Sequence, residues 1–306
     1  MKPRPVPSAA AAAFAAAAAA FALAGTGCLG ELTPEGDKHG YVIASVDLPD
    51  APGEASMFSL DLDGSNRRPN QFGAALAGLG LDTVVTTGLE ASGATVLLEL
   101  QTRDFVDAAA SGIAIRVGSV ISPSPCRGPN DCGHHVSGGG LFNVEFDSTL
   151  EPALFGSVRA GTFLTGFGND LTLLLSIDGL RSIRLPLLAA RVQLSQLTET
   201  RIGKGTIAGG ISQFFLAGPF LDELQIGSVV PLLDSCNFNG TSCTCLAGTA
   251  GSLLQAAFDA DDNCNISRTE LVTTPAITQI LSADLNVDGI PMVSFGMSFV
   301  ANSATF

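Results

Sequence analysis

The alternation of apolar and polar residues predicts that most of the chain from Tyr41 onward forms short β-strands. In Phe142-Asn143-Val144-Glu145-Phe146 the two kinds of residue alternate, which is the pattern of a strand with one buried face. The same kind of pattern recurs along the chain. It predicts strands over Tyr41–Leu48, Ala55–Leu62, Thr95–Thr102, Ile113–Val120, Leu141–Phe146, Leu171–Ile177, Arg184–Leu187, Ala190–Leu197, Arg201–Ala208 and Met292–Phe306.

Apolar residues at helical spacing interrupt this series of strands. Gly218-Pro219 should break one of the resulting helices, because proline removes a helical hydrogen bond. Thr274-Pro275 has the residue types of an N-cap and a first helical position. The predicted helices cover Asn70–Gly80, Leu81–Leu89, Gln213–Leu233 in two pieces, Ser252–Phe258, Thr269–Val272 and Ala276–Leu281.

Together these elements predict a mainly β protein with some α-helix. We expect either a β-sandwich or a curled antiparallel sheet, with a few packed helices and a small helical segment near the C-terminus. A β-rich domain should cover residues 41–245. A second segment, residues 246–306, should hold the late helices and the final strand.

The N-terminus has the pattern of an export signal. Basic residues in Met1-Lys2-Pro3-Arg4 precede a run from Ala9 to Ala24 that is rich in Ala, Phe and Leu. We therefore predict a signal peptide over residues 1–27. No later stretch approaches about 18 uninterrupted apolar residues, so the sequence predicts no membrane-spanning helix beyond the signal.

Two cleavage sites compete. Ala22-Leu23-Ala24 fits an A-x-A site, which would release a secreted protein. Gly25-Thr26-Gly27-Cys28 resembles the lipobox of bacterial lipoproteins, although Gly25 stands where an aliphatic residue is usual. Lipidation of Cys28 would leave six of the seven cysteines, which can pair completely in an oxidising compartment. We therefore favour a protein held by its lipid in the outer membrane or at the cell surface, with residues 28–40 as a tether.

The charge balance excludes some partners. Acidic residues outnumber basic ones by 29 to 15, which gives a formal net charge of −14. Such a chain is repelled by nucleic acid and by anionic membrane faces, so we expect neither as a partner. Tryptophan is absent and Tyr41 is the only tyrosine, which disfavours a carbohydrate-binding platform.

The motif with the clearest chemistry runs from Asp259 to Glu270. Acidic and amide residues alternate at its start, and a glutamate closes it after twelve positions. This spacing resembles an EF-hand calcium loop, in which oxygen ligands wrap around one hard cation. The resemblance implies that residues 246–306 contain an EF-hand-like calcium-binding segment. Its ligands would be Asp259, Asp261, Asn263, Asn265 through its backbone carbonyl, Ser267 directly or through water, and Glu270.

One position departs from the EF-hand pattern. The sixth residue of the loop is normally glycine, because the chain turns there with positive φ, but here it is Cys264. A side chain at such a φ is unfavourable by about 1–2 kcal/mol. A disulfide through Cys264 could hold the turn and offset this strain.

Two further segments have the first half of such a loop. Asp284, Asn286 and Asp288 precede a glycine, but Phe295 stands where the closing acid would be, so an Asp/Asn-rich turn is an equal alternative to a weak calcium loop. Asp61-Leu62-Asp63-Gly64-Ser65 is the other segment, and an ordinary turn is the favoured interpretation there.

The remaining cysteines allow two interpretations. Cys126 and Cys132 lie close to His134 and His135, a spacing that zinc could use, but export favours a disulfide loop. Two more bridges should form among the other four, with pairing that spacing does not decide. The disulfide candidates are Cys126, Cys132, Cys236, Cys243, Cys245 and Cys264.

Motifs of hydrolases, zinc proteases and phosphate-binding enzymes are absent from the sequence. We therefore favour a non-enzymatic, calcium-binding surface protein in which the ion is structural. The alternative is an exported metal-dependent enzyme or zinc protein that uses the Cys126–His135 segment. The sequence discloses no protein partner.

Overall fold

The chain folds largely into β-strands, as its alternating pattern predicts. The structure is a computed structural model. It describes residues 33–77, 81–128, 131–145, 154–176, 182–222, 225, 236–247 and 249–306. The predicted signal peptide and Cys28 lie outside these residues. The strands are β1 (Asp37–Asp47), β2 (Ala94–Thr102), β3 (Ala108–Ser122), β4 (Gly140–Val144), β5 (Leu154–Arg159), β6 (Thr162–Thr165), β7 (Asn169–Ser176), β8 (Ser182–Leu197), β9 (Arg201–Ser212), β10 (Cys236–Phe238), β11 (Cys243–Cys245), β12 (Leu285–Val287) and β13 (Ile290–Thr305).

Helices make up a smaller share of the described residues than strands do. None among the described residues is long and apolar enough to cross a membrane. The helical elements are the 3-10 helix η1 (Pro52–Phe58), the π-helical turn η2 (Leu216–Phe220), and the α-helices α2 (Gln71–Leu76), α3 (Leu81–Ala91), α4 (Gln213–Phe215), α6 (Ala250–Phe258), α7 (Arg268–Thr273) and α8 (Pro275–Ile280).

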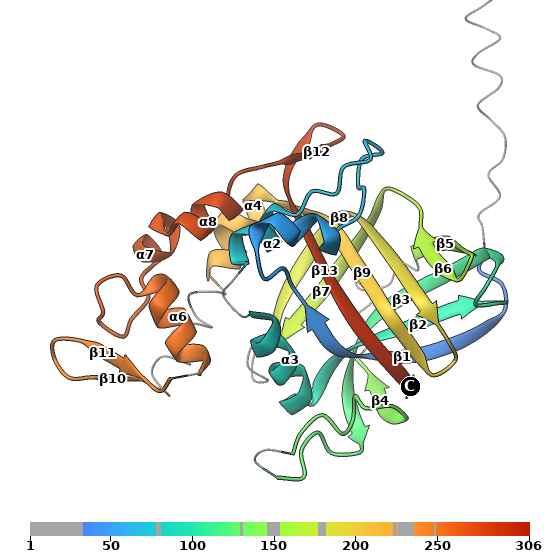
Figure 1. The fold of residues 1–306 in the computed structure, drawn as a ribbon, viewed down its shortest axis with the longest axis horizontal. Coiled ribbons are helices and arrows are strands. Elements are labelled where there is room, and N and C mark those ends of the chain that lie inside the picture. Colours follow the sequence, from blue (N-terminus) through green and yellow to red (C-terminus); the bar gives the residue numbers. More distant parts are fainter. Residues whose placement is uncertain are drawn as a thin grey trace, which may run out of the picture. The chain divides into compact units, whose positions relative to one another are not determined.

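Eight strands close into an antiparallel barrel. Their order around the barrel is β1-β2-β3-β5-β6-β8-β9-β13, and β13 pairs back with β1. Figure 1 shows β13 running between β1 and β9. Because each of the eight strands pairs with its predecessor among them, the barrel is an up-and-down meander.

The prediction of a sandwich or curled sheet with a separate EF-hand-like helical segment is wrong. Such sheets have edge strands, whereas β1 pairs with β2 on one side and with β13 on the other. Tyr41, for example, lies opposite both Leu98 and Ser303. The late helices are short, and the chain returns from them to β13, which is itself a barrel strand. Closure therefore leaves the eight strands without an open edge.

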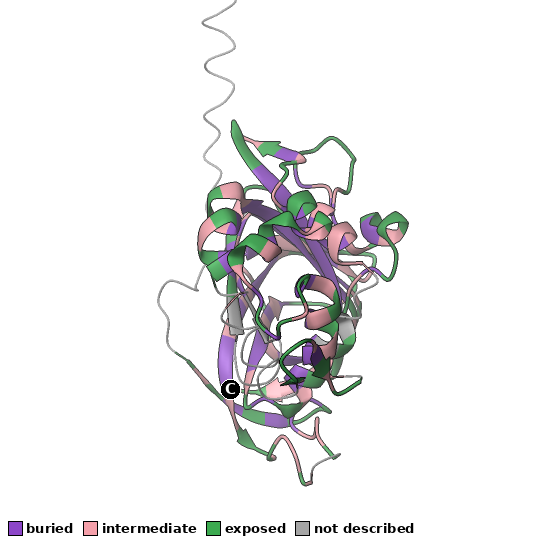
Figure 2. Cartoon of the chain, turned by 90° about the vertical axis from the view of Figure 1, so that its left-hand side faces the viewer, coloured by how far each residue is buried: buried purple, intermediate pink, exposed green. Residues whose placement is uncertain are grey.

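Apolar side chains from all eight barrel strands form one buried cluster. An eight-stranded barrel encloses a space that side chains can fill, and the buried positions follow the strands in Figure 2. Gly205 shows how close this packing is, because a Cβ there would lie 2.1 Å from the ring of Phe299. One representative from each strand is Ile43, Leu98, Ile113, Leu154, Phe163, Leu194, Ile207 and Phe299.

The predicted strand over Ala55–Leu62 is wrong, because this stretch begins as the 3-10 helix η1. Pro52 occupies the first turn of η1, where its missing N–H needs no partner. A buried amide ties η1 to its neighbours. Asn70 caps α2 by accepting the Gly73 N–H at 2.9 Å, and its Nδ2 donates to the carbonyls of Ala55 (3.1 Å) and Gly296 (2.9 Å).

The predicted helix break at Gly218-Pro219 is also not observed. The chain instead passes through Pro219 as the π-turn η2 and is still helical at Leu221. A wider turn accommodates the proline ring that would clash with the preceding turn of a regular α-helix.

The chain between β9 and β13, residues 213–289, is an insertion between two neighbouring barrel strands. Ser212, the last residue of β9, lies opposite Met292 near the start of β13. The insertion therefore leaves and re-enters the barrel at one point. Ile266 and Leu271 of the insertion belong to the same apolar cluster as the barrel residues, so its packing is continuous with the barrel.

The only tyrosine of the chain reports on the closed barrel. Tyr41 is fully buried on β1, and its hydroxyl donates to the carbonyl of Thr198 at 2.7 Å. Burial, with a smaller contribution from Glu199, raises the pKa of Tyr41 far above its ordinary value. We expect no phenolate absorbance as the pH passes about 10, where a free tyrosine ionises. Ionisation should coincide with alkaline unfolding followed by circular dichroism, and a reversible midpoint near 10 in the folded protein would contradict the burial.

Candidate functional site

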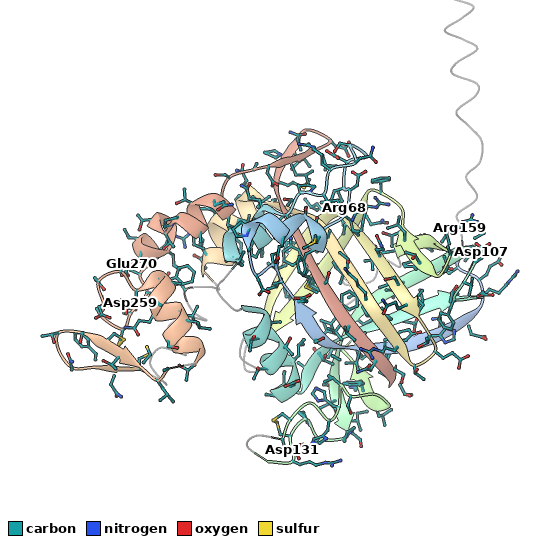
Figure 3. All side chains as sticks on the ribbon, viewed as in Figure 1. Arg68, Asp107, Asp131, Arg159, Asp259 and Glu270 are labelled. Carbon is teal, nitrogen blue, oxygen red and sulfur yellow. A yellow bond between two sulfur atoms is a disulfide. The ribbon has the colours of Figure 1, made fainter. Side chains whose placement is uncertain are left out.

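The strongest candidate site is the Asp259–Glu270 loop, which connects α6 to α7. Thr249 caps α6 by accepting the Ser252 N–H, which fixes the start of the helix that ends at Phe258. Ser267 caps α7, and Glu270 completes a reciprocal capping box with it. Figure 3 shows Asp259 and Glu270 close together, where α6 ends and α7 begins. The first predicted ligand, Asp259, is itself the C-cap of α6, and the last, Glu270, lies in the first turn of α7.

The loop brings three carboxylates together. An oxygen of each of Asp259, Asp261 and Glu270 lies within 4.8 Å of those of the other two. Glu270 reaches back over the loop, where its Oε1 accepts the Ala260 N–H at 3.0 Å and the Asp261 N–H at 3.3 Å. Its Oε2 accepts the Ser267 N–H at 2.8 Å. Residues nine and eleven positions apart thus converge as the spacing predicts.

Asp259 organises the turn at the centre of the loop. Its Oδ1 accepts the Asn263 N–H and its Oδ2 accepts the Cys264 N–H, both at 3.0 Å. Cys264 has a φ of 60°, so the left-handed turn expected at the sixth position is present without a glycine. Asp262 has a φ of 59° as well. At these two positions the backbone is therefore in the left-handed conformation, which is unfavourable for residues that carry a side chain.

The carboxylates differ in their proton affinity. Burial raises the pKa of Asp259, and repulsion from Glu270 and Asp261 adds to this, although hydrogen bonds from Asn263 and Cys264 oppose it. For Glu270 burial acts in the same direction. Hydrogen bonds from Ser267, Asp261 and Ala260 outweigh it, so the net pKa of Glu270 is lowered. The site thus favours the charged form of Glu270, whereas burial and then the negative neighbours disfavour the charged form of Asp259.

The three uncharged residues among the predicted ligands, Asn263, Asn265 and Ser267, do not all lie beside the carboxylates. Asn263 donates its Nδ2 to Asp261 Oδ2 at 2.8 Å, and its Oδ1 accepts the Asn265 N–H at 2.7 Å. The Ser267 hydroxyl accepts the Glu270 N–H in the helix cap. Asn263 therefore lies beside the carboxylates, Asn265 is exposed, and the oxygen of Ser267 is engaged in capping.

Two disulfides fix the loop against a neighbouring hairpin. Cys243–Cys264 joins the loop to β11, and Cys236–Cys245 links the paired strands β10 and β11. The expected disulfide through Cys264 is therefore present, and the pairing that spacing left open is defined. Gln255, which the motif does not include, adds a clamp because its Nε2 donates to the Cys243 carbonyl (2.9 Å) and to Asp262 Oδ1 (2.7 Å).

In the second predicted loop, which begins at Asp284, side chains make hydrogen bonds to nearby residues. Leu285–Val287 and Ile290–Met292 pair as a hairpin, and Asp288 and Gly289 form its turn with φ values of 52° and 83°. The Asp284 carboxylate accepts both the N–H (2.8 Å) and the hydroxyl (2.5 Å) of Ser294. Asn286 Oδ1 accepts the Gly289 N–H at 3.0 Å. The Asp284 and Asn286 side chains therefore bond within this segment, and Asp288 lies in the hairpin turn.

A buried arginine lies beside the Asp61 turn. Arg191 donates to the Asp61 carbonyl at 2.6 Å and to the Thr165 carbonyl, and its guanidinium stacks 3.9 Å from the centre of the Phe167 ring. The Asp61 carboxylate itself accepts backbone N–H groups of its own turn, including those of Gly64 and Asn66. A fixed positive charge at this position disfavours a second cation, and the pattern of the sequence did not identify Arg191.

The Cys126–His135 segment has the disulfide that export favours. Cys126 and Cys132 are bonded to each other, so they offer no thiolate to a metal. His134 bonds Asp131 at 2.9 Å, whereas His135 is fully buried and neither of its ring nitrogens makes a hydrogen bond. Burial lowers the pKa of His135, and the nearby carbonyls of Leu89 and Ser92 offset this only in part.

Comparisons with known proteins give no family for the chain: no family model matches it, and no curated protein or solved structure matches it.

The positive φ of Cys264 predicts how this position responds to substitution. In a Cys243→Ala background, which removes the disulfide, Cys264→Gly should be more stable than Cys264→Ala by about 1 kcal/mol, because glycine tolerates the left-handed turn. Urea unfolding of the two variants measures this difference. Equal stability, or a more stable alanine variant, would show that the loop does not hold this conformation in solution.

The buried His135 predicts a pH dependence of folding. Because its pKa is lowered in the folded state, the unfolded chain takes up a proton first as the pH falls through about 6.5. Stability should then decrease by at most about 1.4 kcal/mol per pH unit. Denaturant unfolding between pH 5.5 and 7.5, both about one unit from the ordinary histidine value, measures the slope. His135→Leu should reduce the slope of the free energy of unfolding against pH. The control His134→Gln should keep the part of the slope that His135 causes. Equal slopes in the two variants would refute this role of His135.

Proposed function

We propose that the protein is an exported, lipid-anchored, non-enzymatic calcium-binding protein of the cell envelope, in which the ion stabilises the insertion between β9 and β13. The observation that carries the proposal is the convergence of Asp259, Asp261 and Glu270 within 4.8 Å, around a turn held by the Cys243–Cys264 disulfide.

The donor set fits a hard cation. Three carboxylates and the amide of Asn263 offer oxygen, and calcium takes six to eight oxygen ligands in flexible arrangements. Zinc prefers nitrogen and sulfur, but the only cysteine in the loop, Cys264, is disulfide-bonded and offers no thiolate. Magnesium requires near-ideal octahedral geometry and keeps its waters, which suits an irregular loop less well.

A structural role follows from where the ligands lie. Asp259 ends α6, and Glu270 lies in the first turn of α7, so one ion would join the two helices through their carboxylates. It would also neutralise the repulsion from Glu270 and Asp261 that adds to the effect of burial on the pKa of Asp259. Calcium loops of extracellular modules bind with dissociation constants of about 0.1–1 mM, which suits constant occupancy outside the cell and not signalling.

Cysteine pairing supports export. The three disulfides pair all six cysteines that follow Cys28, as expected for a protein that folds in an oxidising compartment. Lipidation of Cys28 would then leave no free thiol. Its anchor would place the barrel at the outer membrane or cell surface, and cleavage at Ala22-Leu23-Ala24 would give a secreted form instead.

Calcium should raise the thermal stability of the disulfide-bonded protein. Binding to the folded state alone adds about 1–3 kcal/mol at ten to a hundred times Kd, which corresponds to a few degrees in Tm. Differential scanning calorimetry with calcium or with a chelator measures the shift. Glu270→Gln should abolish it, because the substitution removes a ligand charge but keeps the residue type that a capping box accepts.

Asp288→Asn is the matched control, since Asp288 lies in the hairpin turn and should not bind the ion. Asparagine is also favoured at positive φ, so this variant should retain the full calcium shift. Identical melts of the unsubstituted protein in calcium and in chelator would contradict the proposal.

A further inference from the structure

The two disulfides of the insertion touch each other. On β11, Cys243 and Cys245 are two residues apart, so their side chains lie on the same face of the strand. Their Sγ atoms are 4.0 Å apart, although each is bonded to a different partner. Sulfurs at this distance are placed for thiol–disulfide exchange once one of them is a thiolate.

The two bridges differ in accessibility. Cys243 and Cys264 are each only 6% exposed, whereas Cys236 and Cys245 are partly exposed. An external dithiol therefore reaches the Cys236–Cys245 bridge more readily than the Cys243–Cys264 bridge. Only the buried bridge ends in the Asp259–Glu270 loop.

We propose that these four cysteines form a redox relay, in which reduction of the exposed Cys236–Cys245 bridge is passed by exchange to the buried bridge and releases Cys264 from β11. The effect on calcium rests on the proposed function, whereas the exchange itself does not. The relay makes the calcium loop sensitive to dithiols outside the protein.

The steps balance in atoms and electrons. A dithiol gives two electrons and two protons to Cys236–Cys245, so that two thiols form and the dithiol becomes a disulfide. The Cys245 thiolate then attacks Cys243 Sγ. A Cys243–Cys245 bond forms, the Cys243–Cys264 bond breaks, and its electron pair leaves with Cys264, which takes up a proton. A second dithiol reduces Cys243–Cys245 to two thiols.

Release of Cys264 weakens the calcium loop. Cys264 holds a φ of 60° and donates its N–H to Asp259 Oδ2, and the disulfide is the covalent link that keeps it there. Without the link the turn can relax, and the Asp259 carboxylate loses a fixed partner. By linkage, bound calcium in turn should shift the equilibrium against the release of Cys264.

The exchange is tested by partial reduction. The full disulfide-bonded protein is treated with limiting dithiothreitol, quenched in acid, alkylated and mapped by mass spectrometry. The relay predicts a species in which Cys236 and Cys264 are alkylated while Cys243 and Cys245 are linked. If Cys236 and Cys245 are alkylated and no Cys243–Cys245 species forms at any time, the relay is overturned.

Two variants test the route. Cys236→Ser with Cys245→Ser removes the exposed bridge and should slow reduction of Cys243–Cys264 by about tenfold or more, because direct attack must then reach a buried sulfur. Cys126→Ser with Cys132→Ser removes the third disulfide and should leave the rate unchanged. Absence of phenolate absorbance from Tyr41 at pH about 10 shows that the barrel of each variant is folded. If Cys243–Cys264 is reduced in the Cys236→Ser, Cys245→Ser variant as fast as in the unsubstituted protein, the route is overturned.

Calorimetric titration with calcium completes the test. The reduced protein should bind calcium about tenfold or more weakly than the oxidised protein, as expected for coupling between two sites. Equal affinities would overturn the link between the relay and the loop. If the oxidised protein binds no calcium, the proposed function fails, while the disulfide map still decides whether exchange occurs.

Discussion

The pairing of β13 with both β1 and β9 is the constraint on which the rest of the structure depends. It joins the C-terminal strand to the first strand of the described chain and closes eight strands into a barrel. Closure satisfies backbone hydrogen-bonding groups that a sheet edge would expose, and it encloses one apolar cluster. Tyr41 lies at this seam, where its backbone pairs with both neighbouring strands.

The closed barrel also positions the candidate calcium site. Ser212 and Met292 face each other across β9 and β13, so the chain between them starts and ends at a rigid point. A long insertion between two such fixed ends adds only a small loop-closure penalty, because that penalty grows slowly with length. Disulfides and the ion would then supply the order that a small group of short helices does not provide by itself.

Sequence reasoning predicted what is encoded locally. The alternation along Met292–Phe306 predicted β13, and the spacing from Asp259 to Glu270 predicted a turn that gathers carboxylates, with Cys264 at positive φ in a disulfide. Barrel closure was not predictable, because alternation specifies a buried face and not which distant strand pairs with which edge. The pattern predicts a strand where η1 forms, because a short apolar run fits the periods of both a strand and a helix.

The roles of Arg191 and His135 depend on tertiary packing, which leaves no mark in local sequence. The central claim is that one ion orders the Asp259–Glu270 loop on a barrel that is stable without it. Hydrogen exchange followed by mass spectrometry, with calcium and with a chelator, tests this claim most directly. At exchange times too short for global unfolding, calcium should slow exchange at the Asn263 and Cys264 amides, which donate to Asp259, and leave the amides of β13 unchanged. Unchanged exchange in the loop, or an equal change throughout the barrel, would contradict the account.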